Sequence, residues 1–378
     1  MTVEPIELSP ISDMFDPMDN PNISSLALDP ATDLFLHRFP AFPPAAYAPA
    51  IWATSPVADE EETAFDVDDI DDNSSDTVDP IEDHEFPTYF QQIGSPPRLF
   101  HSHGSYVLPV DSDETKRQEA QHILLRMIIG SNYDAPVREL LNSNPGGRKV
   151  VDLCTGAGHW VLDMAREFPH VKFRGLDLVP IQTRYPPENV RFEIADVTER
   201  LCFADASVDV VHARMACLGE EAVPGFLREV ARILRPGGLF LSAEWDAHPA
   251  LHPRHPWAGG FEDYIPQSIT FYDIASNAVP TLAPSIYTLI TRNGSFEEPV
   301  STRRVIPIST PHATGSNGLR FVGEVMERIS QGYADALVAG RNVPLGIAEN
   351  FKAELSLRNG VVSVYQTVFA RKTVVSPD

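Results

Sequence analysis

The chain has 378 residues, of which 29 are Lys or Arg and 53 are Asp or Glu, giving a formal net charge of −24. This balance disfavours a direct nucleic-acid or anionic-membrane partner, because phosphate binding relies on clustered Lys and Arg. Three scattered cysteines, Cys154, Cys202 and Cys217, argue against a disulfide framework and indicate a reducing compartment. We find no secretory signal and no apolar run of the ~18 residues that a membrane span needs. We therefore expect a soluble protein of the cytoplasm or nucleus.

Residues 1–97 form an acidic, proline-rich segment. They hold 21 acidic residues and 14 of the 34 prolines against one basic residue, Arg38. From Asp59 to Glu85 there are 14 acidic residues and no Lys or Arg. Such a segment repels itself and buries too little apolar surface to offset chain entropy, which predicts a disordered tail. Apolar residues among the acids, such as Phe65 and Ile70, leave open that the tail folds onto a protein partner.

From Arg98 to Asp378 the composition is that of a globular domain. Ser112 and the two acids after it start an amphipathic helix that ends at Gly130 and precedes the core as a helical cap. Short apolar segments then alternate with amphipathic helices. Strands are expected at 149–153, 171–176, 190–194, 208–212 and 239–242, with helices around 160–168 and 224–234. This alternation predicts an α/β fold with a mostly parallel, doubly wound sheet that binds its ligand beyond the carboxyl ends of the strands.

The pattern loosens after Trp245, through a loop rich in His and Pro. Helices are expected around 282–292, 319–338 and 347–357, and strands around 303–308 and 361–370. The two strands are expected to complete the sheet as an antiparallel pair.

The sharpest local signal is the segment from Val150 to Gly158, an apolar strand that ends in Asp152 and turns through Gly156 and Gly158 into a helix. The glycines let the backbone approach a ligand, although two such glycines also occur in many structural turns. A second acid, Asp177, ends the next strand, where a carboxylate can accept hydrogen bonds from both ribose hydroxyls of a nucleoside. The ligand is therefore expected to be an adenosine derivative.

Two positions separate the candidate ligands. A dinucleotide fingerprint calls for Gly or Ala three residues after Gly158, where this chain has Val161, so a nicotinamide-dependent oxidoreductase is disfavoured. Asp196 follows the third strand and is well placed to accept from the exocyclic amine of adenine. The combined set resembles the S-adenosylmethionine site of class I methyltransferases: Asp152, Gly156, Gly158, Asp177 and Asp196.

Residues 98–372 further resemble the fungal LaeA-like methyltransferases. The matching segments are 100–101, 106–109, 121–122, 175–182, 212–214 and 234–238. The resemblance implies a Rossmann-like sheet of seven strands, S-adenosylmethionine as the cofactor and a link to secondary metabolism, but it fixes no methyl acceptor. It also implies that Tyr106 and the helix after it close over the cofactor. Where the family usually has Gly, this chain has Cys154, and we expect a tightened turn that still binds.

Further side chains are expected around the pocket. Leu178 and Val197 follow the acids Asp177 and Asp196 and are expected cofactor contacts, as is Arg214, which could instead orient an acidic acceptor. His212 and Glu244 face the pocket from strand ends and are the candidate general bases. For each of these polar residues, an ordinary hydrogen-bonded role at a strand end is the more common alternative. Trp245 and Trp257 could wall an acceptor pocket or belong to the core.

The histidines do not form a convincing metal site. His101 and His103, or His248, His252 and His255, lack a matching cluster of partner ligands. We therefore expect no metal.

Three functions follow from these observations. The chain is an enzyme that methylates a small molecule or a protein, a regulatory protein that binds cofactor with little turnover, or, least favoured, an oxidoreductase. The methyltransferase is the hypothesis that the combined residues favour.

Overall fold

A computed structural model describes residues 86–102, 106–143, 147–246, 249–251, 265–309, 317–358 and 360–374. The acidic segment 59–85 and the rest of the predicted tail before Phe86 lie outside the described residues. The described part begins with a short 3-10 helix at Phe86–Tyr89 and a two-stranded antiparallel sheet of β1 (Phe90–Ile93) and β2 (Arg98–His101). These three elements include residues before the expected domain start at Arg98.

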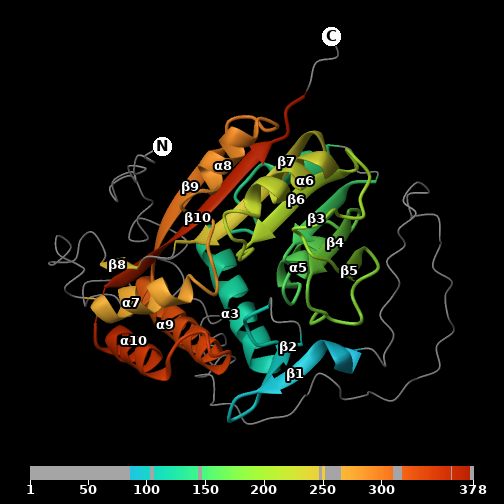
Figure 1. Ribbon diagram of the computed structural model, residues 1–378. Helices are drawn as coiled ribbons and strands as arrows, with labels where there is room; N and C mark the ends of the chain where they lie inside the picture. The colour runs from blue at the N-terminus through green and yellow to red at the C-terminus, as the bar shows by residue number, and fades with distance from the viewer. Residues whose placement is uncertain are drawn as a thin grey trace.

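A central sheet organises the remaining chain (Figure 1). Its strand order is β5-β4-β3-β6-β7-β10, with β9 and the two-residue β8 both pairing with β10. The bounds are β3 (Lys149–Leu153), β4 (Lys172–Asp177), β5 (Val190–Ile194), β6 (Val208–Arg214), β7 (Leu234–Trp245), β8 (Ala250–Leu251), β9 (Val300–Pro307) and β10 (Val361–Arg371). The order reverses between β3 and β6, which is where a doubly wound sheet binds its ligand.

The strand directions confirm the predicted fold class. The pairs β5-β4, β4-β3, β3-β6 and β6-β7 are parallel, whereas β10 runs antiparallel to both β7 and β9. The antiparallel pairing of β9 with β10 is the one predicted from the sequence. Seven strands make up the predicted sheet, and β8 adds a two-residue ladder at one end of β10.

Helices cover both faces of the sheet. On one face, α5 (His159–Glu167) and α4 (Val137–Asn142) pack through Trp160 and Leu141 against Val150 and Val210. On the other face, α6 (Val223–Ile233) and α8 (Ile286–Asn293) pack against alternate residues of the same strands. Because side chains alternate across a strand, a central strand that is buried on both faces appears as a continuous apolar run.

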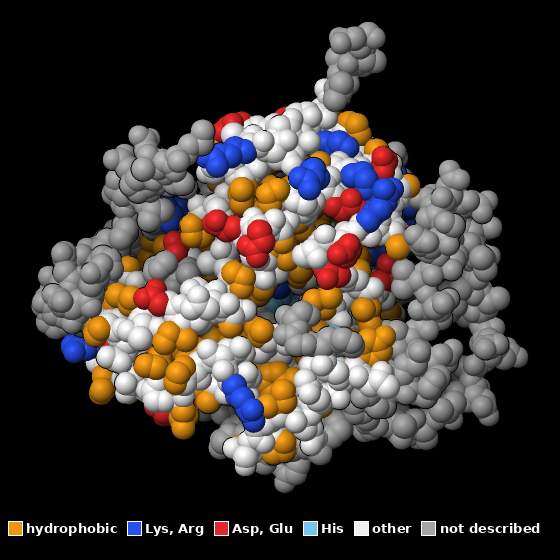
Figure 2. Space-filling view, viewed as in Figure 1, with side chains coloured by type: hydrophobic (Ala, Val, Ile, Leu, Met, Phe, Trp, Pro, Cys, Tyr) orange, Lys and Arg blue, Asp and Glu red, His pale blue; other side chains and the backbone are white. Residues whose placement is uncertain are grey.

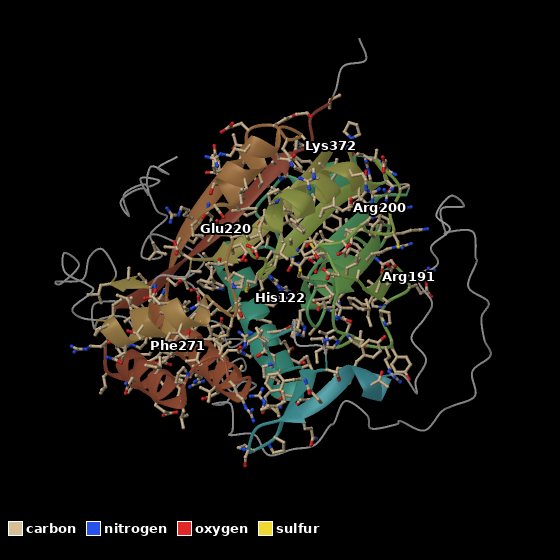
Figure 3. The ribbon with its side chains drawn as sticks, viewed as in Figure 1. His122, Arg191, Arg200, Glu220, Phe271 and Lys372 are labelled. Atoms are coloured by element: carbon tan, nitrogen blue, oxygen red, sulfur yellow. The ribbon has the colours of Figure 1, made fainter. Side chains whose placement is uncertain are left out.

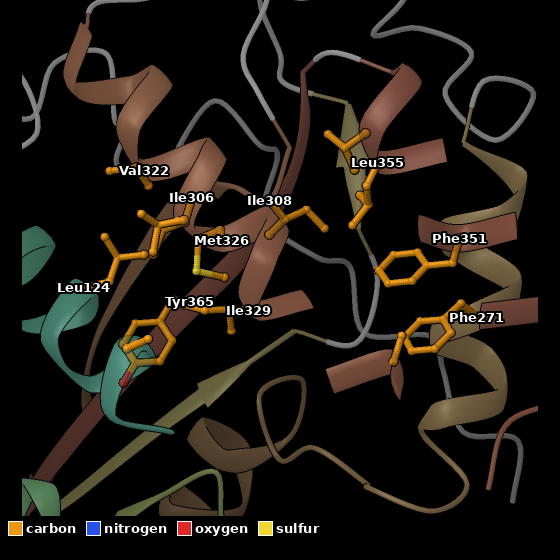
Figure 4. Packing of buried hydrophobic residues seen from close by; sticks show 14 of the residues in the cluster. Leu124, Phe271, Ile306, Ile308, Val322, Met326, Ile329, Phe351, Leu355 and Tyr365 are labelled. Atoms are coloured by element: carbon orange, nitrogen blue, oxygen red, sulfur yellow. The ribbon is translucent and has the colours of Figure 1, made fainter. Parts of the chain in front are cut away.

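A separate helical layer lies at one end of the sheet. It contains α3 (Ser112–Ile129), α7 (Pro266–Ala275), α9 (Asn317–Ala339) and α10 (Leu345–Leu357). In Figure 1 the last three helices are grouped beside α3. Figure 4 shows part of their shared core, in which the rings of Phe271 and Phe351 stack with centroids 4.1 Å apart. Asp111 caps α3 by accepting from the Glu114 N–H at 3.1 Å, one residue earlier than the predicted start. The layer therefore has its own apolar core, and α3 connects it to the sheet.

Two expectations about the elements were wrong. The segment after Trp245 was expected to hold no element, yet residues 266–275 form α7. Strand β7 begins at Leu234 rather than 239, because the Pro236-Gly237-Gly238 turn lies within an irregular stretch of the ladder to β6.

Candidate functional site

A cavity of about 500 Å³ lies beyond the carboxyl ends of β3, β4 and β6, between the sheet and α3. Figure 2 shows the surface hollowed near the centre of this view, and Figure 3 places His122 of α3 in the same region. The structure brings together eleven of the twelve predicted site residues on its wall: Tyr106, Asp152, Cys154, Gly156, Asp177, Leu178, Asp196, Val197, His212, Arg214 and Glu244.

The glycine turn after β3 has the tight geometry that the sequence predicted. Gly156 has φ +56°, and a Cβ on it would lie 2.7 Å from Gln118 Oε1. The Gly158 N–H donates to the carbonyl oxygen of Thr155 at 3.0 Å, which closes the turn before α5 begins. The backbone of Gly156 therefore forms part of the cavity wall, in a conformation that is strained for any larger residue.

Gly158, the twelfth predicted residue, does not line the cavity. It has φ +80° at the start of α5, and a Cβ on it would lie 2.5 Å from the Phe192 ring. The structure therefore requires glycine here for packing against β5. The contact between Gly158 and the cofactor stays a prediction. A glycine required for packing and a glycine required for ligand approach look the same in a sequence, so the sequence did not separate the two roles.

Asp177 ends β4 and points to the glycine turn. Its Oδ2 accepts from the Gly156 N–H at 2.7 Å, and its Oδ1 accepts from the Val179 N–H at 3.2 Å. The residue is 5% exposed, and burial raises the pKa of its carboxyl to about 6. A carboxylate held at this turn is positioned to accept hydrogen bonds from a nucleoside.

Asp196 follows β5 on the same wall of the cavity. Its Oδ1 accepts from the Thr198 N–H at 2.9 Å and from the Thr198 hydroxyl at 2.6 Å, and the residue is exposed. The side chain thus shapes the turn after β5. Val197 beside it is buried.

Asp152 and His212 lie side by side on β3 and β6. His212 Nδ1 is 2.6 Å from Asp152 Oδ1, and the imidazole stacks on the Trp160 indole with ring centroids 3.9 Å apart. Asp152 Oδ2 accepts from the Thr155 hydroxyl at 2.7 Å. Burial lowers the pKa of His212, so the imidazole stays neutral and donates from Nδ1 to the carboxylate. The pair fixes the floor of the cavity.

Glu244 on β7 binds the loop that follows β6. Its Oε1 accepts from the Ala216 N–H at 3.1 Å, while Met215 and Cys217 on either side have φ of 53° and 52°. Burial raises the pKa of Glu244 to about 8. The carboxyl is therefore largely protonated at neutral pH, and it holds a loop with an unfavourable backbone conformation.

The guanidinium of Arg214, at the end of β6, is held in place by a contact with His122 of α3. An Arg214 guanidinium nitrogen lies 3.2 Å from His122 Nδ1, and His122 Nε2 lies 3.2 Å from Asp163 Oδ2. Burial lowers the pKa of His122 to about 4, so the ring is neutral, accepts from Arg214 and donates to Asp163. This chain of contacts holds a permanent positive charge at the cavity wall.

The sequence interpretation missed two residues that support the glycine turn. Gln118 Oε1 accepts from the Ala157 N–H at 3.2 Å, and Gln182 Nε2 donates to the Gly156 carbonyl at 2.5 Å. Gln118 belongs to a polar row on α3 at helical spacing, with Glu114 and Gln121. That spacing was a usable signal, since a polar row on an otherwise buried helix faces a cavity or another polar group.

Tyr106 lies on the cavity wall, in the segment before α3, and burial raises the pKa of its hydroxyl. Replacing Tyr106 with Ala is expected to weaken cofactor affinity about tenfold, because an aromatic contact on the ligand is lost. Tyr106→Phe, which keeps the ring, is expected to stay within about twofold of the wild type. Calorimetric titration compares the three proteins, and unchanged affinity in the Ala variant would contradict the proposed closure.

Cys154 has φ 57°, a left-handed conformation that costs a non-glycine residue about 1–2 kcal/mol. Glycine, the residue usual in the family, adopts this conformation without strain. We therefore expect Cys154→Gly to preserve or improve cofactor affinity, measured by calorimetry. An affinity loss of more than tenfold would contradict the alignment of this turn with the family.

In the described residues, no three His, Cys, Asp or Glu side chains gather as a metal site would require. His103, His248, His252, His255 and Trp257 lie outside the described residues. No helix in the described part is both long and apolar enough to cross a bilayer.

Comparison with known proteins agrees with this geometry. Residues 150–238 match the methyltransferase domain family. The secondary metabolism regulator laeA of Coprinopsis cinerea is 38% identical over 145 residues, covering 38% of this chain and 36% of that protein. The protein-methionine methyltransferase laeA of Emericella nidulans is 30% identical over 162 residues, covering 42% of this chain and 41% of that protein. The matches thus span less than half the length of these relatives.

One solved structure among those similar is the phosphoethanolamine N-methyltransferase 2 of Haemonchus contortus in complex with S-adenosyl-L-methionine. It is 17% identical with a TM-score of 0.37, covering 69% of this chain and 59% of that one.

Residues 150–238, which match the methyltransferase domain family, lie within the doubly wound sheet, the arrangement expected of a class I methyltransferase domain. Over part of its length the chain is similar to the relatives named laeA.

Proposed function

We propose that the chain binds S-adenosylmethionine in this cavity and transfers its methyl group to an acceptor, either a small molecule or a protein. The observation that carries the proposal is the Asp177 carboxylate, which ends β4 and hydrogen-bonds the Gly156 N–H inside a cavity at the carboxyl edge of the sheet. A nucleoside with two ribose hydroxyls matches that carboxylate in chemistry. The half-buried Gly156 carries no side chain, so the turn leaves room for the ligand beside it.

The chain's own residues hold the cofactor in this proposal. Asp177 accepts from the ribose, Leu178 and Val197 enclose the adenine, and Asp196 accepts from its amine. When bound, the cofactor supplies a sulfonium methyl whose C–S electron pair stays on sulfur, while a lone pair of the acceptor forms the new bond and any acceptor proton passes to water. The protein's main contribution is to hold the reacting atoms ~3–3.5 Å apart and in line.

His212 and Glu244 are the candidate bases, and their surroundings limit what they do. The Nδ1 of His212 is hydrogen-bonded to Asp152 and Glu244 is mainly protonated at neutral pH, so neither the Nδ1 nor the carboxyl is free to accept a proton there. We infer that both position the cavity walls and that transfer proceeds without a strong base, as in-line displacement permits.

The second candidate function is a regulatory protein that binds cofactor with little turnover. The name of the Coprinopsis relative, a secondary metabolism regulator, favours it. The name of the Emericella relative, a protein-methionine methyltransferase, favours the enzyme. We connect the present chain with secondary metabolism, in the cytoplasm or nucleus, on the basis of these similarities and its three free cysteines.

Incubation of the full chain with methyl-labelled S-adenosylmethionine in a native extract distinguishes these two functions. Turnover predicts label in a specific small molecule or protein band, which the Asp177→Asn variant does not produce. Cofactor binding without acceptor labelling would favour the regulator. The presence of equal label with the variant would contradict the proposed site.

The pH dependence of cofactor binding follows from Asp177. Its pKa in the folded chain is about 6, above the ordinary value of 3.8, so the carboxylate that ribose hydroxyls require is present above pH 6 and lost below it. Affinity is therefore expected to be flat above pH 7 and about tenfold weaker at pH 5. Calorimetry across this range measures it, with circular dichroism to verify folding. Equal affinity at pH 5 and pH 7 would contradict the assigned role.

A further inference from the structure

The cavity extends beyond the nucleoside half, into the helical layer. Side chains from α7 and α9 form this far half, together with the residue after β9 and the end of β7. They are mostly apolar or aromatic: Trp245, Tyr272, Ile308, Met326, Ile329 and Tyr333. Figure 4 shows Ile308, Met326 and Ile329 within the packed core of the layer. The far half is thus a rigid extension of the cofactor site.

Apart from Arg214 at the end of β6, which lies against the neutral His122, the charged groups that reach this half are already neutralised. Arg117 binds Glu114 through two contacts of 2.8 and 2.6 Å, and both residues are buried. Asp246 lies 3.6 Å from Arg303. Glu244 accepts from the Ala216 N–H and is mainly protonated at neutral pH. Because a charge moved into such surroundings loses hydration without gaining a counter-charge, a charged ligand group would be disfavoured here.

The far half also contains three side-chain hydroxyls, those of Tyr272, Ser330 and Tyr333. The Tyr272 hydroxyl is hydrogen-bonded to Ser330, and the Tyr333 ring lies 5.6 Å from the Arg117 guanidinium carbon. Ser330 and Tyr333 are three residues apart on α9, so they lie on the same helix face. Burial raises the pKa of Tyr272 to about 12 and raises that of Tyr333, so both hydroxyls remain protonated. A few hydroxyls in an apolar pocket are typical of a site that orients an uncharged ligand.

We propose that this half is the acceptor subsite, and that it takes a small, uncharged, mainly apolar molecule oriented by the hydroxyls of Tyr272, Ser330 and Tyr333. The proposal rests on the proposed function, since it assigns the nucleoside half to the cofactor. The cavity of about 500 Å³ must hold both ligands, and sites of ~300–1,000 Å³ usually accommodate a single drug-sized molecule. The acceptor is therefore expected to be smaller than a typical drug.

Two probes with the same ring, one bearing a neutral hydroxyl and the other a carboxylate, test this assignment. The full chain, saturated with S-adenosylhomocysteine, is titrated at pH 7 with 2-naphthol and with 2-naphthoate, which carry the same ring. The naphthol is expected to bind at least tenfold more tightly. A third titration uses a lysine-rich peptide, which is expected not to bind. Tighter binding of the naphthoate or of the peptide would overturn the proposal.

Single-hydroxyl variants localise the binding. Tyr333→Phe and Tyr272→Phe remove one oxygen each and keep the rings, so they preserve packing, and naphthol affinity is expected to fall at least threefold in one of them. Tyr287→Phe, an exposed tyrosine of α8, is the matched control. Unchanged naphthol affinity in both pocket variants would overturn the proposal. Binding of S-adenosylhomocysteine without naphthol refutes this inference alone, whereas failure of both ligands to bind refutes the proposed function.

Discussion

Replacing Asp177 with Asn is expected to weaken S-adenosylmethionine binding about 100-fold, or ~3 kcal/mol. The carboxylate lies on the cavity wall at the end of β4 and is 5% exposed. In the proposed complex the ribose hydroxyls donate to it as charge-assisted hydrogen bonds, each contributing ~1.5–3 kcal/mol. An amide keeps the shape and one acceptor oxygen, but it loses the charge and places an N–H₂ group against one of the two donors.

Asp205→Asn is the matched control for this substitution. Asp205 is exposed and pairs with Arg232 away from the cavity, so cofactor affinity is expected to stay within about twofold of the wild type. Calorimetry measures both variants, and thermal unfolding verifies that each is folded. A folded Asp177→Asn protein with wild-type affinity would remove Asp177 from the site.

Replacing Arg117 with Met is expected to lower the free energy of unfolding by ~3–5 kcal/mol. Glu114, one turn away on α3, is 1% exposed and makes two contacts with the Arg117 guanidinium. Among the described residues, removing the cation leaves the buried Glu114 carboxylate with the Gln118 amide as its remaining side-chain donor, at 3.1 Å. Breaking one side of a buried ion pair costs more than the pair itself contributes.

Urea denaturation measures the loss in the free energy of unfolding. Two further variants test whether the loss comes from the buried charge of Glu114. In Glu114→Gln/Arg117→Met the buried charge is gone, so at least half of the lost stability is expected to return. Lys116→Met, on the exposed side of the same helix, is expected to change stability by less than ~0.5 kcal/mol. A loss below ~1 kcal/mol for Arg117→Met would show that water reaches the pair.

Strand β3 was predictable because it is buried on both faces, and residues 149–153 have the bounds that the sequence indicated. Strand β5 lies at the edge of the sheet and is mostly half-buried, and its bounds, 190–194, are also those that the sequence indicated. Helix α7 was missed because Phe271, its deepest side chain, packs against Phe351 from a helix that is distant in sequence. Packing against a distant helix does not require a helical period of apolar residues within the segment itself, so residues 266–275 carry no clear sequence signal. The strand β1 was missed because its partner, rather than its own residues, stabilises it.

The sequence predicted those site residues that stand at the carboxyl ends of strands. Asp152 and Asp177 end neighbouring parallel strands, and that alone placed them together. Gln118 was missed because its helix comes from outside the sheet, and a sequence does not show which cavity a helix face will cover. Gly158 was assigned to the ligand, whereas the ring that excludes a side chain there belongs to Phe192 on another strand. Contacts between distant segments account for each of these differences.

The central claim, that the cavity at the strand ends binds a sulfonium nucleoside, is tested most directly by calorimetric titration of the full chain with S-adenosylmethionine and with NAD. We expect saturable binding of S-adenosylmethionine that S-adenosylhomocysteine competes away, and no binding of NAD. Binding of NAD in place of S-adenosylmethionine, or of neither by a folded protein, would contradict the account.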